Sequence, residues 1–131
     1  MFVLHSDEYL QLHHYPDLGY VRLVRTGEPF GSISRVGASL RECANALSHL
    51  NVTRLGLLLD WRLAPLSTDP ILLKHVVQQS DVFAAMFPRR ALLMATPIGI
   101  MQSERLARSI HHANPVLFND EAAAIAHVIS P

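Results

Sequence analysis

Apolar residues along the chain fall either into short continuous runs or into spacings of three and four, which predicts strands that alternate with helices. The run Leu55–Leu59 is too short for a helix, so we predict an interior strand that is covered on both faces. Two more short runs predict strands over Ala91–Ala95 and Val116–Phe118. Near the amino end, partial alternation predicts a hairpin of two strands, Tyr9–His14 and Tyr20–Thr26.

Four other stretches have the spacing of amphipathic helices. In chain order these are a stripe of Ile33, Val36, Leu40, Cys43, Leu47 and Leu50, a helix from Asp69-Pro70 to Phe87, a helix over Ile100–Ala113, and a stripe of Ala122, Ile125, Ala126 and Ile129. An acidic cap followed by proline is a strong helix start. The alternation predicts a single α/β domain with a mixed, mostly parallel sheet of about five strands and about four helices.

Composition narrows the classes of function. Lys+Arg and Asp+Glu number 11 each, which argues against a nucleic-acid or anionic-membrane surface. Little net charge opposes self-association, so a homodimer is expected. A single cysteine precludes an internal disulfide and a cysteine-rich zinc site. The amino end lacks the features of a signal peptide, and no apolar run approaches the ~20 residues that cross a bilayer, so we expect a cytoplasmic protein without membrane insertion.

Three features support a resemblance along nearly the full length. The Leu55–Asp60 strand is followed by a loop and a helix that begins at Asp69, Ala91–Ala95 leads into Ile100–Ala113, and the chain closes with Val116-Leu-Phe-Asn-Asp-Glu-Ala-Ala-Ala. With the amino-terminal strand pair, this layout resembles the SpoIIAA-like, or STAS-type, domain family and its uncharacterised branch. The resemblance implies a non-enzymatic regulatory or protein-interaction module that binds a partner protein.

The same resemblance draws attention to one loop. In the anti-sigma-factor antagonists of that family, the loop after the central strand carries an Asp-Ser-Ser-Gly motif with a phosphorylated serine. Here residues 60–69 read Asp-Trp-Arg-Leu-Ala-Pro-Leu-Ser-Thr-Asp, which lacks the motif. Ser67 and Thr68 fall near the corresponding place, so they are candidate phosphorylation sites by position alone.

The carboxyl ends of parallel strands meet at one edge of a sheet, where α/β proteins usually have their sites. Helix starts at that edge present free backbone N–H groups to an anion or a phosphorylated side chain. We therefore predict partner or anion binding at Asp60, Trp61 and Arg62. The simpler interpretation, favoured by the frequency of cap residues at such positions, is that Ser67, Thr68 or Asp69 caps a helix and Asp60 pairs with an arginine. Trp61 either anchors a partner or closes the core.

Metal and enzyme chemistry find little support in the sequence. The pairs His13-His14 and His111-His112 point their side chains apart on a strand or a helix, so no metal site and no cofactor are predicted. Cys43 lies on an apolar stripe and is predicted to be buried and inert. Without a nucleophile elbow, a P-loop or a dinucleotide fingerprint, we predict that the protein is not an enzyme.

One alternative function stays open. Several large apolar residues lie on neighbouring predicted elements, namely Phe83, Met86, Phe87, Met94 and Met101. Such residues are more often plain core. They are also compatible with a small-ligand or lipid-binding domain of the same fold.

Overall fold

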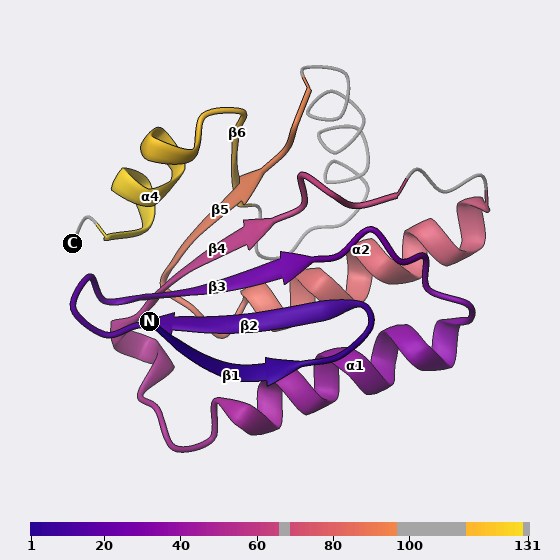
Figure 1. The fold of residues 1–131 in the computed structure, drawn as a ribbon, viewed down its shortest axis with the longest axis horizontal. Helices are drawn as coiled ribbons and strands as arrows, with labels where there is room; N and C mark the ends of the chain where they lie inside the picture. The colour runs from indigo at the N-terminus through magenta and orange to yellow at the C-terminus, as the bar shows by residue number, and fades with distance from the viewer. Residues whose placement is uncertain (66–68, 97–114, 130–131) are drawn as a thin grey trace.

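One mixed β-sheet organises the described residues, which are 1–65, 69–96 and 115–129 of this computed structural model (Figure 1). Its six strands are β1 (Phe2–Ser6), β2 (Leu10–Tyr15), β3 (Tyr20–Arg25), β4 (Gly56–Asp60), β5 (Arg89–Leu93) and β6 (Val116–Phe118). They lie side by side in chain order, with β1, β2 and β3 antiparallel and β3 to β6 parallel. The predicted α/β class and mixed sheet are confirmed.

The prediction of about five strands is wrong by one, because the chain forms a strand before the predicted hairpin. Strand β1 pairs with β2, and its register shifts between Val3 and His5. It lies at the edge of the sheet with Phe2 and Val3 exposed, so its sequence carries no regular alternation. The turn after it contains no glycine or proline; instead the Asp7 carboxylate accepts hydrogen bonds from the backbone N–H groups of Tyr9 and Leu10.

Three α-helices lie in the described part of the chain: α1 (Ile33–Ala46), α2 (Pro70–Ala84) and α4 (Glu121–Ile129). A 3-10 turn, η1 (Val52–Arg54), precedes β4. The Asp69 side chain accepts hydrogen bonds from the N–H groups of Ile71 and Leu72, which confirms the predicted cap of α2. The predicted helix over 100–113 lies outside the described residues. Among the described helices, none has the length and apolar character needed to cross a membrane.

The helices cover the two faces of the sheet unequally (Figure 1). Helices α1 and α2 pack on one face, because the connections from β3 to β4 and from β4 to β5 advance in the same direction along the sheet. Helix α4 packs on the other face, against β4 and β5. Leu57 and Leu59 point into the α1–α2 core, whereas Leu58 points toward α4. All five residues of β4 are buried, which confirms the predicted interior strand.

The predicted apolar stripe of the last helix is confirmed only in part: Ile125 and Ile129 pack, partly buried, against the core between α4 and the sheet. Helix α4 buries Ala124 and Val128 against the sheet, while Ala122 and Ala126 are exposed. Small and apolar residues occur all around this helix, so its sequence does not select a face, and contact with β4 and β5 decides it. In α1 the predicted stripe is largely confirmed, but Ile33 at its first position is 43% exposed.

The close packing of α4 over β4 predicts a large effect of a methyl group at Gly56. A Cβ at Gly56 would lie 2.8 Å from both the carbonyl carbon and the Cβ of Val128. We expect Gly56→Ala to lower the free energy of unfolding by about 2 kcal/mol in urea denaturation. Gly37→Ala in α1 is the matched control, since a Cβ there meets nothing within 4 Å and alanine favours a helix by roughly 0.5–1 kcal/mol. Equal stability of the two variants would contradict this packing.

The buried Cys43 predicts a chemically silent thiol. Burial raises the pKa of the Cys43 thiol to about 12, and the side chain is fully buried in the α1–α2 core. Because the thiolate is the reactive form, iodoacetamide is expected to leave the native protein unlabelled near pH 8 and to label it fully in denaturing urea. Rapid labelling of the native protein would show that α1 opens readily.

Candidate functional site

The alternation of β4 continues past its end and separates the three residues that the sequence places together. Asp60 is buried on the α4 face of the sheet. The Trp61 side chain turns to the opposite face and packs, half-buried, against the α1–α2 core. The backbone N–H of Trp61 donates to the carbonyl of Leu93 on β5. Arg62 folds back onto Asp60. The predicted edge therefore has a charged side and an aromatic side.

The charged side is a closed ring of two acids and two bases, the carboxyl-edge ion cluster of Arg22, Asp60, Arg62 and Glu121. Arg62 grips the Asp60 carboxylate with Nε at 2.9 Å and Nη2 at 2.8 Å. Arg22 on β3 lies with Nη1 3.5 Å from Asp60 and Nη2 2.8 Å from Glu121 in the first turn of α4. Arg62 Nη1 closes the ring at 3.1 Å from Glu121. The cluster is neutral overall and ties the amino end of α4 to the ends of β3 and β4.

Electrostatics keep both acids of this cluster ionised. Burial raises the pKa of the Asp60 carboxyl, but hydrogen bonds from Arg62 and the charges of Arg62 and Arg22 outweigh burial, so that the pKa lies below its usual value. The hydrogen bond from Arg22 is the largest influence on Glu121 and lowers its pKa as well. At neutral pH Asp60 is thus a weakly basic carboxylate that is held by cations.

Arg22 and Glu121 were missed in the sequence because both are distant from Asp60 along the chain. The register pairs Val24 of β3 with Asp60, so Arg22 lies two residues away on the same face of the sheet. Only the sheet order brings these residues together. Helix α4 then returns over β5 and β4 and places Glu121 above both arginines.

The aromatic side contains a shallow apolar hollow of about 260 Å3, here called the Trp61 hollow. Its walls include Phe30, Trp61, Leu72, Leu73 and Val76. The sequence left open whether Trp61 closes the core or anchors a partner. The half-buried side chain packs against the core and also lines this hollow, and partner binding stays a prediction.

A stack of side chains borders the Trp61 hollow on the side toward β2. The Arg25 guanidinium lies 4.2 Å from the centre of the Phe30 ring, and that ring stacks on Tyr9 with centroids 4.8 Å apart. Arg25 is buried and donates to the carbonyls of Tyr9 and Thr26. The stack is therefore fixed by backbone contacts as well as by ring contacts.

The candidate phosphorylation sites Ser67 and Thr68 lie outside the described residues. Asp69, which follows them, caps α2 and lines the Trp61 hollow. Phosphorylation at Ser67 or Thr68 stays a prediction.

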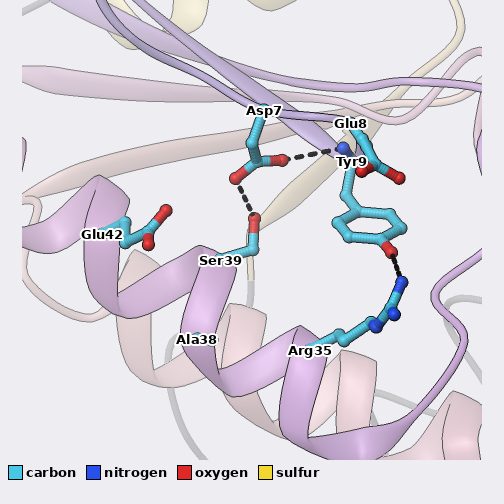
Figure 2. Close-up of a pocket in the computed structure, with 7 residues that line it drawn as sticks. All are labelled: Asp7, Glu8, Tyr9, Arg35, Ala38, Ser39 and Glu42. Carbon is cyan, nitrogen blue, oxygen red and sulfur yellow. Dashed lines mark hydrogen bonds between the residues drawn. The ribbon is translucent and has the colours of Figure 1, made fainter.

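Beyond the Tyr9–Phe30 stack lies a second shallow hollow of about 270 Å3, the Asp7 hollow, between the start of β2 and α1 (Figure 2). The Asp7 carboxylate points to α1, where the Ser39 hydroxyl donates to its Oδ2 at 2.7 Å. His5 Nε2 lies 2.7 Å from the same oxygen and 3.5 Å from Glu42 Oε2. Arg35 borders the hollow and donates to the Tyr9 hydroxyl.

No sequence pattern indicated this second group, because His5 comes from the end of β1, Asp7 from the turn after it, and Ser39 and Glu42 from α1. Burial raises the pKa of the Asp7 carboxyl, but hydrogen bonds from His5, Ser39 and the backbone bring it below its usual value. Serine, histidine and aspartate meet here, yet Asp7 is the acceptor shared between the other two. A catalytic triad requires histidine in the middle, so this arrangement is not one.

Comparisons with protein-family models, with curated proteins and with solved structures find no match. The resemblance to the SpoIIAA-like family accordingly stays a prediction.

The ion cluster predicts how stability depends on pH. Because the pKa of Asp60 is lower in the folded protein, its charge stabilises the fold at neutral pH, and this stabilisation is lost as the pH falls below about 3.9 through the folded pKa. Asp60→Asn leaves Arg22 and Arg62 without this carboxylate, so we expect a loss of about 3 kcal/mol at neutral pH. The variant should also lose less stability than the wild type between neutral pH and about pH 3.

Urea denaturation of the wild type and Asp60→Asn at neutral pH and at about pH 3 measures both the loss of stability and its smaller dependence on pH. Asp17→Asn, at an exposed position in the β2–β3 turn, serves as the control and is expected to change stability by less than about 0.5 kcal/mol. If Asp60→Asn matched this control at neutral pH, the ion cluster would contribute nothing to the fold.

Proposed function

We propose that this chain is a non-enzymatic regulatory or protein-interaction module of the SpoIIAA-like, STAS type, which binds another protein through the carboxyl ends of its parallel strands. The observation that carries the proposal is the position of Trp61. It is half-buried at the end of the central strand and lines an apolar hollow, beside a neutral cluster of charges.

This edge has the composition of a protein interface. Tryptophan is enriched among the residues that dominate binding energy, and such residues lie in apolar pockets surrounded by polar groups. Asp69 lines the Trp61 hollow and is exposed, and the two residues that follow Trp61 in the chain are exposed as well, Leu63 to 67%. A partner side chain in the hollow would bury apolar surface, while the exposed polar groups would set its orientation.

The strand order favours a partner protein over a small ligand. Ligand crevices in open α/β sheets form where the strand order reverses, and the described strands run in sequence without a reversal. The Trp61 hollow is also slightly smaller than the 300–1,000 Å3 usual for ligand pockets. Of the residues that suggested a lipid or ligand site, those in the described part of the chain do not border it: Phe83 and Phe87 are core, and Met86 is 38% exposed. Met101 lies outside the described residues.

Side-chain chemistry supports a non-enzymatic role. Asp60 is held by four hydrogen bonds from Arg22 and Arg62, so its lone pairs are engaged. Cys43 is buried with a raised pKa, and Asp7 separates His5 from Ser39. Within the described residues, no nucleophile and base lie in the relation that covalent catalysis needs.

Phosphorylation at Ser67 or Thr68 would be the regulatory element of this proposal. These residues directly precede Asp69, which lines the Trp61 hollow. A phosphate adds about two negative charges and strong acceptor oxygens, which would change the polar border of the interface. Mass spectrometry of the protein from its native cells tests this element separately from partner binding.

Site-specific cross-linking tests the interface directly. A photoreactive residue at Leu63, next to the Trp61 hollow, should capture the partner in native cells. The same residue at Leu18, in the β2–β3 turn at the opposite end of the parallel strands, should not. With the purified partner, binding should change the fluorescence of Trp61, the sole tryptophan of the chain. Trp61→Ala should weaken binding about 30-fold, the loss expected for a dominant interface residue.

Leu18→Ala is the matched control and should bind as the wild type does, and Trp61→Phe serves if Trp61→Ala unfolds. Equal capture from both positions, or unchanged affinity of the Trp61 variants, would refute the proposed interface. A small molecule retained in native mass spectrometry and displaced by Trp61→Ala would instead favour the ligand-binding alternative.

A further inference from the structure

Three potential metal ligands converge beside the Asp7 hollow. His5 Nε2, a carboxylate oxygen of Asp7 and one of Glu42 all lie within 4.8 Å of one another. They come from the end of β1, the turn that follows it, and the middle of α1. The convergence therefore depends on the docking of α1 against the first two strands.

The spacing of the three atoms is close to that of a metal site. Tetrahedral coordination at about 2.0–2.1 Å places ligand atoms roughly 3.3 Å apart. His5 Nε2 and Glu42 Oε2 are 3.5 Å apart, which already fits. His5 Nε2 and Asp7 Oδ2 are 2.7 Å apart, because they share a hydrogen bond whose proton a metal ion would replace. Glu42 is 61% exposed, so its side chain has room to close on the ion.

Hydrogen bonds from neighbouring groups fix the orientation of the Asp7 carboxylate, as the outer shell of a metal site does. Asp7 Oδ1 accepts from the N–H groups of Tyr9 and Leu10, which leaves Oδ2 as the oxygen that faces His5. The Ser39 hydroxyl donates to Oδ2 and holds its orientation. Hydrogen bonds of this kind orient ligating carboxylates in metal proteins. Ser39 and Glu42 lie three positions apart and so share one face of α1.

The fourth side of the group is open. Asp7, Ser39 and Glu42 form one wall of the Asp7 hollow, and Arg35 lies at the same hollow (Figure 2). A water molecule or an anion from solvent can therefore complete the coordination of an ion held by the three side chains. An imidazole nitrogen with two carboxylates suits zinc and neighbouring transition metals, whereas magnesium prefers oxygen ligands alone.

We propose that His5, Asp7 and Glu42 form a binding site for one divalent transition-metal ion of the Zn2+ class, with its fourth position open to the Asp7 hollow. The ion takes the lone pair of His5 Nε2, and the proton on that nitrogen moves to Nδ1 or to solvent. This site shares no residue with the interface of the proposed function, so each stands or falls separately.

Isothermal titration of chelator-treated protein with zinc chloride at neutral pH tests the proposal. We expect one ion per chain, and no binding of magnesium at the same concentrations. Glu42→Gln keeps the size of an exposed side chain but removes its charge, and it should weaken zinc binding at least about tenfold. His5→Ala should weaken binding at least as much, because it removes the only nitrogen ligand.

His49→Ala is the matched control, since His49 lies near His14 rather than in the proposed site. Nitrogen NMR of the histidine rings gives a second reading: zinc should shift Nε2 of His5 and leave His13 unchanged. Absence of stoichiometric zinc binding would overturn the proposal. So would binding that survives in both His5→Ala and Glu42→Gln but disappears in His49→Ala. The NMR measurement on wild-type protein decides the matter if a variant does not fold.

Discussion

Burial of β4 on both faces is the constraint on which the described structure depends. Leu57 and Leu59 are covered by α1 and α2, and Leu58 by α4. Each fully buried leucine stabilises the fold by roughly 2 kcal/mol relative to an exposed one. A strand with no exposed face must lie inside the sheet, and the pairs β3–β4 and β4–β5 follow from that position.

The same two-sided burial determines what appears at the end of the strand. Because successive side chains point to opposite faces, Asp60 and Trp61 cannot share a site. Asp60 enters the α4 face, where two arginines neutralise it. Trp61 enters the α1–α2 face, where apolar residues surround it. One strand end thus provides a fixed electrostatic clamp for α4 and, on the other side, an aromatic surface.

Sequence patterns predicted an element correctly where a few neighbouring residues determine it. The central strand was predicted from an uninterrupted apolar run, and α2 from the Asp69-Pro70 cap, because a few neighbouring residues determine each. Strand β1 was missed because an edge strand with an irregular register has little alternation to read. The two fully buried residues of α4, Ala124 and Val128, were also missed, since alanines around the helix leave that choice to the sheet.

The candidate site residues likewise fall into those that the sequence predicted and those that only tertiary structure brings together. Asp60, Trp61 and Arg62 were selected because they follow a recognisable strand, although their separation onto two faces was not foreseen. Arg22 and Glu121 join Asp60 only through strand order and the return of α4. The group of His5, Asp7 and Glu42 depends on the docking of a helix against an unpredicted strand. Contacts of this kind are set by tertiary structure, and one sequence does not encode them in any local pattern.

The stack of Tyr9, Phe30 and Arg25 is a partition shared by two concavities: Tyr9 lines the Asp7 hollow, and Phe30 and Arg25 line the Trp61 hollow. Displacement of either ring would change the shape of both the Asp7 hollow and the Trp61 hollow. A substitution of Tyr9, Phe30 or Arg25 would therefore alter both hollows together. Substitutions at Glu42 and at Trp61, which lie on opposite sides of the stack, alter one hollow each.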